Sequence, residues 1–164
     1  MSLQYMFYAN SIAVIGASKD PKKLGYTVLK NIIDGGYKGK IYPINPKLDE
    51  ILGFKAYQGL LNVEGEVDLA VVIVPAKAVE SVLEDAGKKG VKNAIIISGG
   101  FRETGQDGEI LEKQVLDVAK KYGIRILGPN CQGINYTYNN LCASWPLITR
   151  KGPMAIISQS GTIG

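Results

Sequence analysis

Short apolar runs alternate with longer amphipathic stretches along most of this chain. The first run, residues 12–15, contains no polar residue, as is typical of a strand buried on both faces of a parallel sheet. Four further runs are mainly apolar and also predict strands: residues 40–44, 68–74, 94–98 and 124–127. Because strands that alternate with helices form parallel sheets with right-handed crossovers, the pattern predicts a doubly wound, Rossmann-like α/β fold.

Three stretches between these runs carry apolar residues at helical spacing. The first stripe consists of Leu24, Val28, Leu29, Ile32 and Ile33 and stops at Asp34-Gly35-Gly36. The second and third predicted helices lie within residues 76–86 and 110–122. Residues 48–66 are less regular and predict only a short extended piece at 54–56 and a helical turn near Leu60.

The turn after the first strand is built from small residues. Gly16 permits a sharp turn, Ala17 and Ser18 follow it, and Gly25 lies near the start of the first helix. A strand, a small-residue turn and a helix N-terminus direct backbone N–H groups at an anion, usually a phosphate. The same turn contains Lys19, Lys22 and Lys23. The Gly-x-Gly-x-x-Gly dinucleotide motif is absent, so an ordinary strand-to-helix turn is the alternative interpretation.

The ends of all five predicted strands are small, polar or proline-containing. They are Gly16-Ala17-Ser18, Asn45-Pro46-Lys47, Val74-Pro75-Ala76, Ser98-Gly99-Gly100 and Gly128-Pro129-Asn130. Each is ordinary turn chemistry when taken alone. In a doubly wound sheet, however, ligands bind beyond the carboxyl ends of the strands, near the point where the strand order reverses. Five such ends at one edge therefore predict a binding cleft.

The end of the second strand narrows the choice of ligand. NAD-binding domains usually place Asp or Glu there, because a carboxylate accepts hydrogen bonds from the ribose 2′-hydroxyl. This chain has Asn45-Pro46-Lys47 instead. A lysine attracts a phosphorylated ribose, whereas a carboxylate repels it. NADP or coenzyme A (CoA), which carries a ribose 3′-phosphate, is therefore favoured over NAD.

Charge and composition exclude several classes of function. The net charge of +4 comes from residues 1–60, which contain eight lysines and four acidic residues. So local an excess favours a small polyanionic ligand, and no nucleic-acid partner is predicted. The absence of histidine excludes histidine metal sites and serine–histidine triads, and no metal site is predicted. Two cysteines, no apolar run near about 20 residues and no signal-peptide pattern predict a cytoplasmic protein without a membrane span.

Seven short motifs follow one another along the chain, at residues 14–18, 21–25, 42–47, 74–76, 98–105, 128–133 and 157–161. In this order they resemble the first domain of the nucleoside-diphosphate-forming acyl-CoA synthetases. That family includes the ADP-forming acetyl-CoA synthetases and the α subunit of succinyl-CoA synthetase. Because the pattern from Gly16 to Gly25 is not shared with dehydrogenases, the resemblance favours CoA over NADP as the cofactor.

The resemblance also implies roles for individual residues. Gly16, Ala17, Ser18 and the turn to Gly25 would hold the CoA diphosphate. Lys23 and Lys47 would neutralise phosphate charge, and Asn45 and Pro46 would border the adenosine. The residues implied for the pantetheine arm are Val74, Pro75, Ala76, Ser98, Gly99 and Gly100, with Asn130 near the thiol end. A cysteine nucleophile needs a partner that stabilises its thiolate, so we interpret Cys131 as a packing residue.

The resemblance divides the chain at residue 150. Residues 1–150 would form the CoA-binding domain, and residues 151–164 would begin a second α/β domain. That second part would comprise a strand at 152–157 and a phosphate turn with Ser158, Ser160 and Gly161. On this interpretation the chain is a truncated piece of a longer polypeptide and is inactive alone. ATP or ADP, Mg²⁺ and a phosphorylated histidine would belong to the remaining synthetase domains or to a nucleotide-grasping β subunit.

Three hypotheses about function follow from the sequence. The first is the CoA-binding domain of an NDP-forming acyl-CoA synthetase, whose full reaction is acyl-CoA + phosphate + NDP ⇌ acid + CoA + NTP. The second is a stand-alone CoA-binding module without catalysis. The third is a fragment of an NADP-dependent oxidoreductase.

Overall fold

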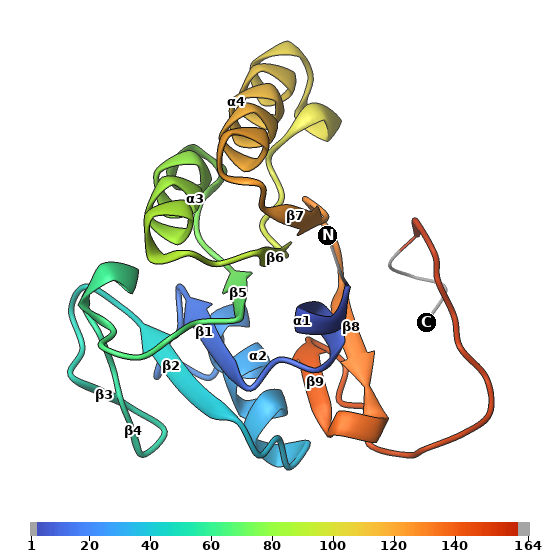
Figure 1. The fold of residues 1–164 in the computed structure, drawn as a ribbon. Helices are drawn as coiled ribbons and strands as arrows, with labels where there is room; N and C mark the ends of the chain where they lie inside the picture. The colour runs from blue at the N-terminus through green and yellow to red at the C-terminus, as the bar shows by residue number, and fades with distance from the viewer. Residues whose placement is uncertain (1–2, 161–164) are drawn as a thin grey trace.

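A five-stranded sheet forms the centre of the molecule (Figure 1), of which a computed structural model describes residues 3–160. The strands are β1 (Ser11–Ile15), β2 (Lys40–Ile44), β5 (Leu69–Val72), β6 (Asn93–Ile96) and β7 (Arg125–Leu127). Their order is β2-β1-β5-β6-β7, and every neighbouring pair is parallel. The order reverses between β1 and β5, so the predicted doubly wound α/β fold is confirmed.

Helices cover both faces of this sheet (Figure 1). On one face lie α3 (Ala76–Lys89) and α4 (Gln106–Tyr122), which pack with Val72, Ala94 and Ile96 in one hydrophobic cluster. On the other face lies α2 (Leu24–Asp34), whose Val28, Leu29 and Ile32 are fully buried. The predicted helices are therefore present, although Leu24 and Ile110 of the predicted apolar stripes are exposed.

The second face is completed by segments that the sequence pattern did not predict. A short helix, α1 (Gln4–Phe7), and an antiparallel hairpin of β8 (Gly133–Tyr136) and β9 (Leu141–Ser144) lie on the α2 side of the sheet (Figure 1). The hairpin is fastened to α2 by Asn31, whose Nδ2 donates to the carbonyl oxygens of Ser144 and Trp145 at 3.0 and 2.8 Å. Both segments are short and owe their structure to this packing, which local periodicity does not reveal.

The irregular stretch predicted over residues 48–66 contains a second small hairpin. Its strands are β3 (Glu50–Ile51) and β4 (Phe54–Lys55), and the 3₁₀ turn η1 (Leu60–Asn62) follows. The short extended piece and the helical turn are therefore present. Two further 3₁₀ turns are η2 (Arg102–Thr104) and η3 (Thr137–Asn139).

The chain after β9 has no regular secondary structure as far as residue 160, so the strand expected at residues 152–157 stays a prediction for the second domain. A strand needs a partner for its backbone groups, and here Ile156 and Ile157 are exposed instead of packed against a neighbour. Among residues 3–160, no helix has the length and apolar character that crossing a membrane requires.

Candidate functional site

The turn after β1 brings backbone into direct contact with backbone. Gly16 has φ +93°, and a Cβ placed on it would lie 2.1 Å from the carbonyl oxygen of Ile73, after β5. Gly25, in the first turn of α2, is equally confined, since its Cβ would lie 2.0 Å from the carbonyl oxygen of Gly16. Real Cβ atoms do not come this close to an oxygen, so both positions require glycine. We call residues 16–25 the β1 turn.

The β1 turn ends at a helix N-terminus without a side-chain cap. Lys23 precedes α2 in an extended conformation, and no side chain accepts a hydrogen bond from the first amides of the helix. Ser18 is buried, and its Oγ accepts a hydrogen bond from the amide of Asp20 at 3.0 Å. Ala17 is buried as well, so its methyl group does not face solvent. An uncapped helix N-terminus beside a lysine is suited to an anion.

Asn45 joins the end of β2 to the β1 turn. Its Nδ2 donates to the carbonyl oxygen of Ala17 at 2.8 Å, and its Oδ1 accepts from the amide of Lys47 at 2.9 Å. Its own amide donates to the carbonyl oxygen of Tyr57 at 2.9 Å. Asn45 is thus occupied by contacts within the protein, whereas the Lys47 side chain is exposed.

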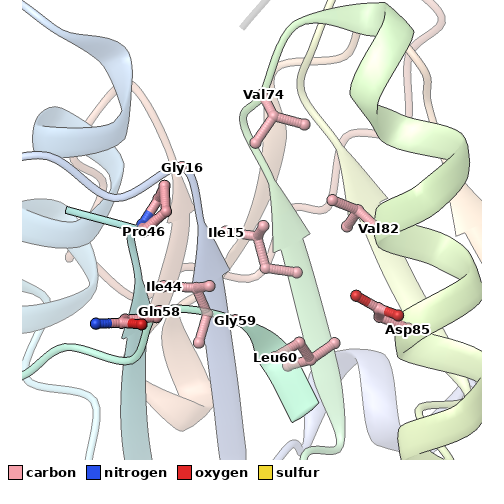
Figure 2. Close-up of a pocket in the computed structure, with 10 residues that line it drawn as sticks. All are labelled: Ile15, Gly16, Ile44, Pro46, Gln58, Gly59, Leu60, Val74, Val82 and Asp85. Atoms are coloured by element: carbon pink, nitrogen blue, oxygen red, sulfur yellow. The ribbon is translucent and has the colours of Figure 1, made fainter. Parts of the chain in front are cut away.

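A cavity of about 220 Å³ lies beside the ends of β1, β2 and β5 (Figure 2). Its walls are mainly apolar, with Ile15, Ile44 and Leu60 on one side and Val82 of α3 on the other. Of the residues predicted from sequence, Gly16, Pro46 and Val74 line it. Gln58 and Asp85 also line it and were not predicted. They come from an irregular segment and from the middle of a helix, where no strand-end motif marks them.

Ser98 joins the ends of three strands. Its Oγ accepts a hydrogen bond from the amide of Val74 at 3.1 Å, and its carbonyl oxygen accepts from the amide of Asn130 at 2.9 Å. The side chain is buried, with 8% of its surface exposed. The contacts of Ser98 therefore fix the relative positions of the loops after β5, β6 and β7. Pro75 and Ala76 continue the β5 end into the start of α3.

A carboxylate that was absent from the predicted site residues lies next to the glycines after β6. Glu103 Oε1 accepts a hydrogen bond from the amide of Gly100 at 2.6 Å, and this bond lowers the pKa of the carboxyl. A Cβ placed on Gly99 would lie 3.1 Å from Asn130 Oδ1 and 3.2 Å from Glu103 Oε1. We call residues 98–103 together with Asn130 the β6 wall.

Cys131, next to Asn130, has the environment of a packing residue. Its Sγ donates to the carbonyl oxygen of Ile96 at 3.3 Å, and burial raises the pKa of the thiol. A raised pKa makes the thiolate nucleophile scarce. Within residues 3–160, no group of three His, Cys, Asp or Glu side chains is arranged to hold a metal ion.

The residues predicted for a second phosphate turn lie in the exposed segment after β9. Ser158 Oγ accepts a hydrogen bond from the amide of Ser160 at 3.0 Å, which forms a local serine turn. Both residues are exposed. Gly161 lies outside the described residues, and the structure brings neither serine to the edge that holds the β1 turn and the β6 wall.

One family model matches most of the chain. Residues 10–137 match the family model described as a CoA binding domain. The chain is 50% identical, over 99% of its length, to acetate–CoA ligase (ADP-forming) II subunit alpha of Pyrococcus furiosus. It is 51% identical, over 98% of its length, to acetate–CoA ligase (ADP-forming) of Methanocaldococcus jannaschii.

Two solved structures resemble this chain over almost its whole length. A protein of Pyrococcus horikoshii OT3 superposes with a TM-score of 0.95 at 49% identity, covering 99% of this chain and 37% of its own. The dinucleotide forming acetyl-coenzyme A synthetase 1 of Ca. Korarchaeum cryptofilum, in complex with phosphate and ADP, superposes with a TM-score of 0.94 at 45% identity, covering 99% of this chain and 35% of its own. The chain spans 35% of the P. furiosus relative and 22% of the M. jannaschii relative.

Proposed function

Because the chain belongs to the family of CoA-binding domains, we propose that the edge formed by the β1 turn, the cavity and the β6 wall binds coenzyme A. The observation that carries this proposal is the β1 turn, in which two obligatory glycines bring an uncapped helix N-terminus close to the strand ends. Such a turn accommodates a diphosphate, which needs backbone N–H donors and room for close contact.

The charged groups of CoA are its diphosphate and its ribose 3′-phosphate, and each would lie near a lysine. The diphosphate would lie on Gly16, Ala17 and Ser18 and on the N-terminus of α2, with Lys23 close by. The exposed Lys47 would neutralise the ribose 3′-phosphate. Ala17 and Ser18 would contribute backbone groups, because their side chains are buried.

The uncharged parts of CoA match the remaining strand ends. The adenosine would occupy the mainly apolar cavity, with Pro46 on its border and Asn45 holding that border in place. The pantetheine arm would run along Val74, Pro75 and Ala76 and then along Ser98, Gly99 and Gly100, with the thiol near Asn130. The contacts of Ser98 support this path, since they place the three loops side by side.

We further propose that the chain supplies the CoA site of an ADP-forming acid–CoA ligase. Relatives of that name cover the whole chain at about half identity, and the chain spans no more than about a third of each. The sequence contains no histidine, so a phosphohistidine step would use another domain or a separate β subunit. The exposed apolar residues 156–157 support the proposal that residues 151–164 belong to a second domain, with Ser158, Ser160 and Gly161 as its phosphate turn.

Calorimetric titration of the purified chain tests the proposed function. CoA should bind with micromolar affinity, and NADPH should bind far more weakly. Tighter binding of NADPH would instead support an oxidoreductase fragment. A second assay with ATP, acetate and CoA should show no acetyl-CoA formation by this chain alone, and measurable turnover would contradict the division of labour proposed here.

A further inference from the structure

Glu103 has a contact at the proposed pantetheine site that the CoA-binding role does not yet explain. Its carboxylate accepts a hydrogen bond from the amide of Gly100 at 2.6 Å and lies next to Gly99. The side chain is otherwise exposed to solvent. A glutamate fixed in this way on a glycine pair has a more specific task than solubility, because holding a long side chain in one position costs conformational entropy.

The segment that carries Glu103 is held in place by its own hydrogen bonds and by contacts with α4. Phe101 is fully buried, and its carbonyl oxygen accepts hydrogen bonds from the amide and the Oγ1 of Thr104, both at 2.8 Å. Arg102 Nε pairs with Glu112 of α4 at 2.9 Å. A Cβ on Gly108 would lie 1.8 Å from the Phe101 oxygen, so α4 packs directly on this turn. The position of Glu103 is therefore set by the packing of η2 on α4.

The hydrogen bond from Gly100 to Glu103 decides which polar group the loop presents to a ligand. The peptide between Gly99 and Gly100 is trans, since the only cis peptide among the described residues precedes Pro129. In a trans peptide the N–H and the C=O point in opposite directions. With the Gly100 N–H turned toward Glu103, the Gly99 carbonyl is turned the other way. Gly100 has φ +102°, so the loop has this shape only with glycine at that position.

We propose that Glu103 is a positioning residue for the pantetheine arm of CoA. By holding the Gly100 amide, it makes the loop after β6 a hydrogen-bond acceptor, through the Gly99 carbonyl, for an amide N–H of pantetheine. Loss of the carboxylate lets the glycine pair rotate, and the acceptor is no longer fixed. The inference rests on the proposed function and adds to it a residue that acts through the backbone rather than by touching CoA.

Two substitutions at Glu103 and two ligands test this role by calorimetric titration. Glu103→Ala should weaken CoA binding roughly tenfold, because one fixed hydrogen bond is lost. Adenosine 3′,5′-bisphosphate, which lacks pantetheine, should bind the variant as it binds the wild type. Glu103→Gln retains an oxygen that can accept from Gly100 and should recover most of the CoA affinity. Glu109→Ala, at an exposed position on α4, is the matched control and should bind both ligands normally.

The possible failures are distinguishable. Unchanged CoA affinity in Glu103→Ala would overturn the inference, and tighter binding would show that the carboxylate obstructs the site. Equal losses for CoA and for the bisphosphate would reduce Glu103 to a general structural role, which also overturns it. Failure of the wild-type chain to bind CoA would instead refute the proposed function, and the inference with it.

Discussion

At the β1 turn the backbone packs against backbone, whereas at the β6 wall it is held by side chains. Gly16 and Gly25 leave no room for a Cβ, and the confining atoms are the carbonyl oxygens of Ile73 and Gly16. At the β6 wall the loop is fixed by the Ser98 hydroxyl and the Glu103 carboxylate. Both regions lie at the carboxyl ends of strands that belong to the same parallel sheet.

The difference implies two kinds of sensitivity to substitution. The β1 turn depends on the lack of a side chain at Gly16 and Gly25, so adding even one methyl group there must displace backbone atoms. The β6 wall depends on side chains that are present, so removing them leaves unpaired polar groups behind. A diphosphate needs the first construction, because its oxygens must come within reach of several N–H groups at once. The uncharged pantetheine arm does not require such close backbone contact, so side chains can hold the loop beside it.

The largest effect is expected from adding a methyl group to the β1 turn. Gly16→Ala should lower the free energy of unfolding by about 3–4 kcal/mol and abolish CoA binding, since a Cβ 2.1 Å from the Ile73 oxygen forces the strand ends apart. Gly36→Ala is the matched control, because Gly36 also has positive φ but has nothing within 4 Å of its Cβ position. That variant should lose only about 1 kcal/mol. Equal losses in denaturant melts would mean that φ, not contact, makes Gly16 necessary.

The next effect concerns charge within the same turn. Ser18→Asp should reduce CoA affinity about a hundredfold or more, because a carboxylate next to the backbone groups that would hold the diphosphate repels it by about 3 kcal/mol. The melting temperature should move by only a few degrees, since Asp can accept the Asp20 amide as Ser18 does. Ser18→Asn, similar in shape and uncharged, should retain most of the binding. Micromolar binding by Ser18→Asp in calorimetry would place the diphosphate elsewhere.

The β6 wall should respond to removal of a hydroxyl. Ser98→Ala should cost about 2 kcal/mol of stability in chemical denaturation, because the part-buried amide of Val74 loses its acceptor. Ser81→Ala removes a hydroxyl that bonds the Ala78 carbonyl oxygen on the exposed surface of α3, and it should cost less than about 0.5 kcal/mol. Equal losses of stability in the two variants would mean that the Ser98 hydroxyl does not stabilise the contact between the strand ends.

The smallest effect separates the two phosphate positions. Lys47→Glu should weaken CoA by about 1–2 kcal/mol but leave dephospho-CoA nearly unaffected, because only CoA carries the ribose 3′-phosphate. Lys38→Glu, which lies before β2 instead of after it, should weaken neither ligand measurably. The six affinities, those of the wild type and of both variants for both ligands, come from parallel titrations. A loss that is the same for CoA and dephospho-CoA would mean that Lys47 does not face that phosphate.

Much of the fold was predictable because the central strands correspond to mainly apolar runs in the sequence. Residues 12–15 and 40–44 coincide with β1 and β2 to within one residue. The hairpin of β8 and β9 was not predictable, because its residues become buried only by packing on α2 through Asn31. Residues 152–157 are also a mainly apolar run, and without a neighbouring strand to pair with they carry no strand in the described structure.

In the candidate site, too, some residues could be placed from the sequence and others could not. Glycines and prolines at strand ends mark positions where the backbone must turn, so Gly16, Pro46 and Val74 could be placed beside the cavity from sequence. Gln58, Asp85 and Glu103 carry no such mark. Their places depend on how η1 and α3 meet and on how η2 packs against α4, which are tertiary contacts. Glu103 does fall within the motif at residues 98–105, and its spacing from Gly100 was the available signal.

The fastening of α2 to the second hairpin has a consequence for how the chain folds. Asn31 and its acceptor on Ser144 are 113 residues apart, so this contact closes a loop that spans most of the chain. Contacts between distant residues are slow to form, since the loop entropy is lost before the contact stabilises anything. On a ribosome, α2 would emerge before β9, and until then the Asn31 amide would lack its two carbonyl acceptors. A fragment that ended at residue 137, where the family match ends, would never satisfy that amide. Completion of this domain therefore depends on β9 and not on the central sheet alone.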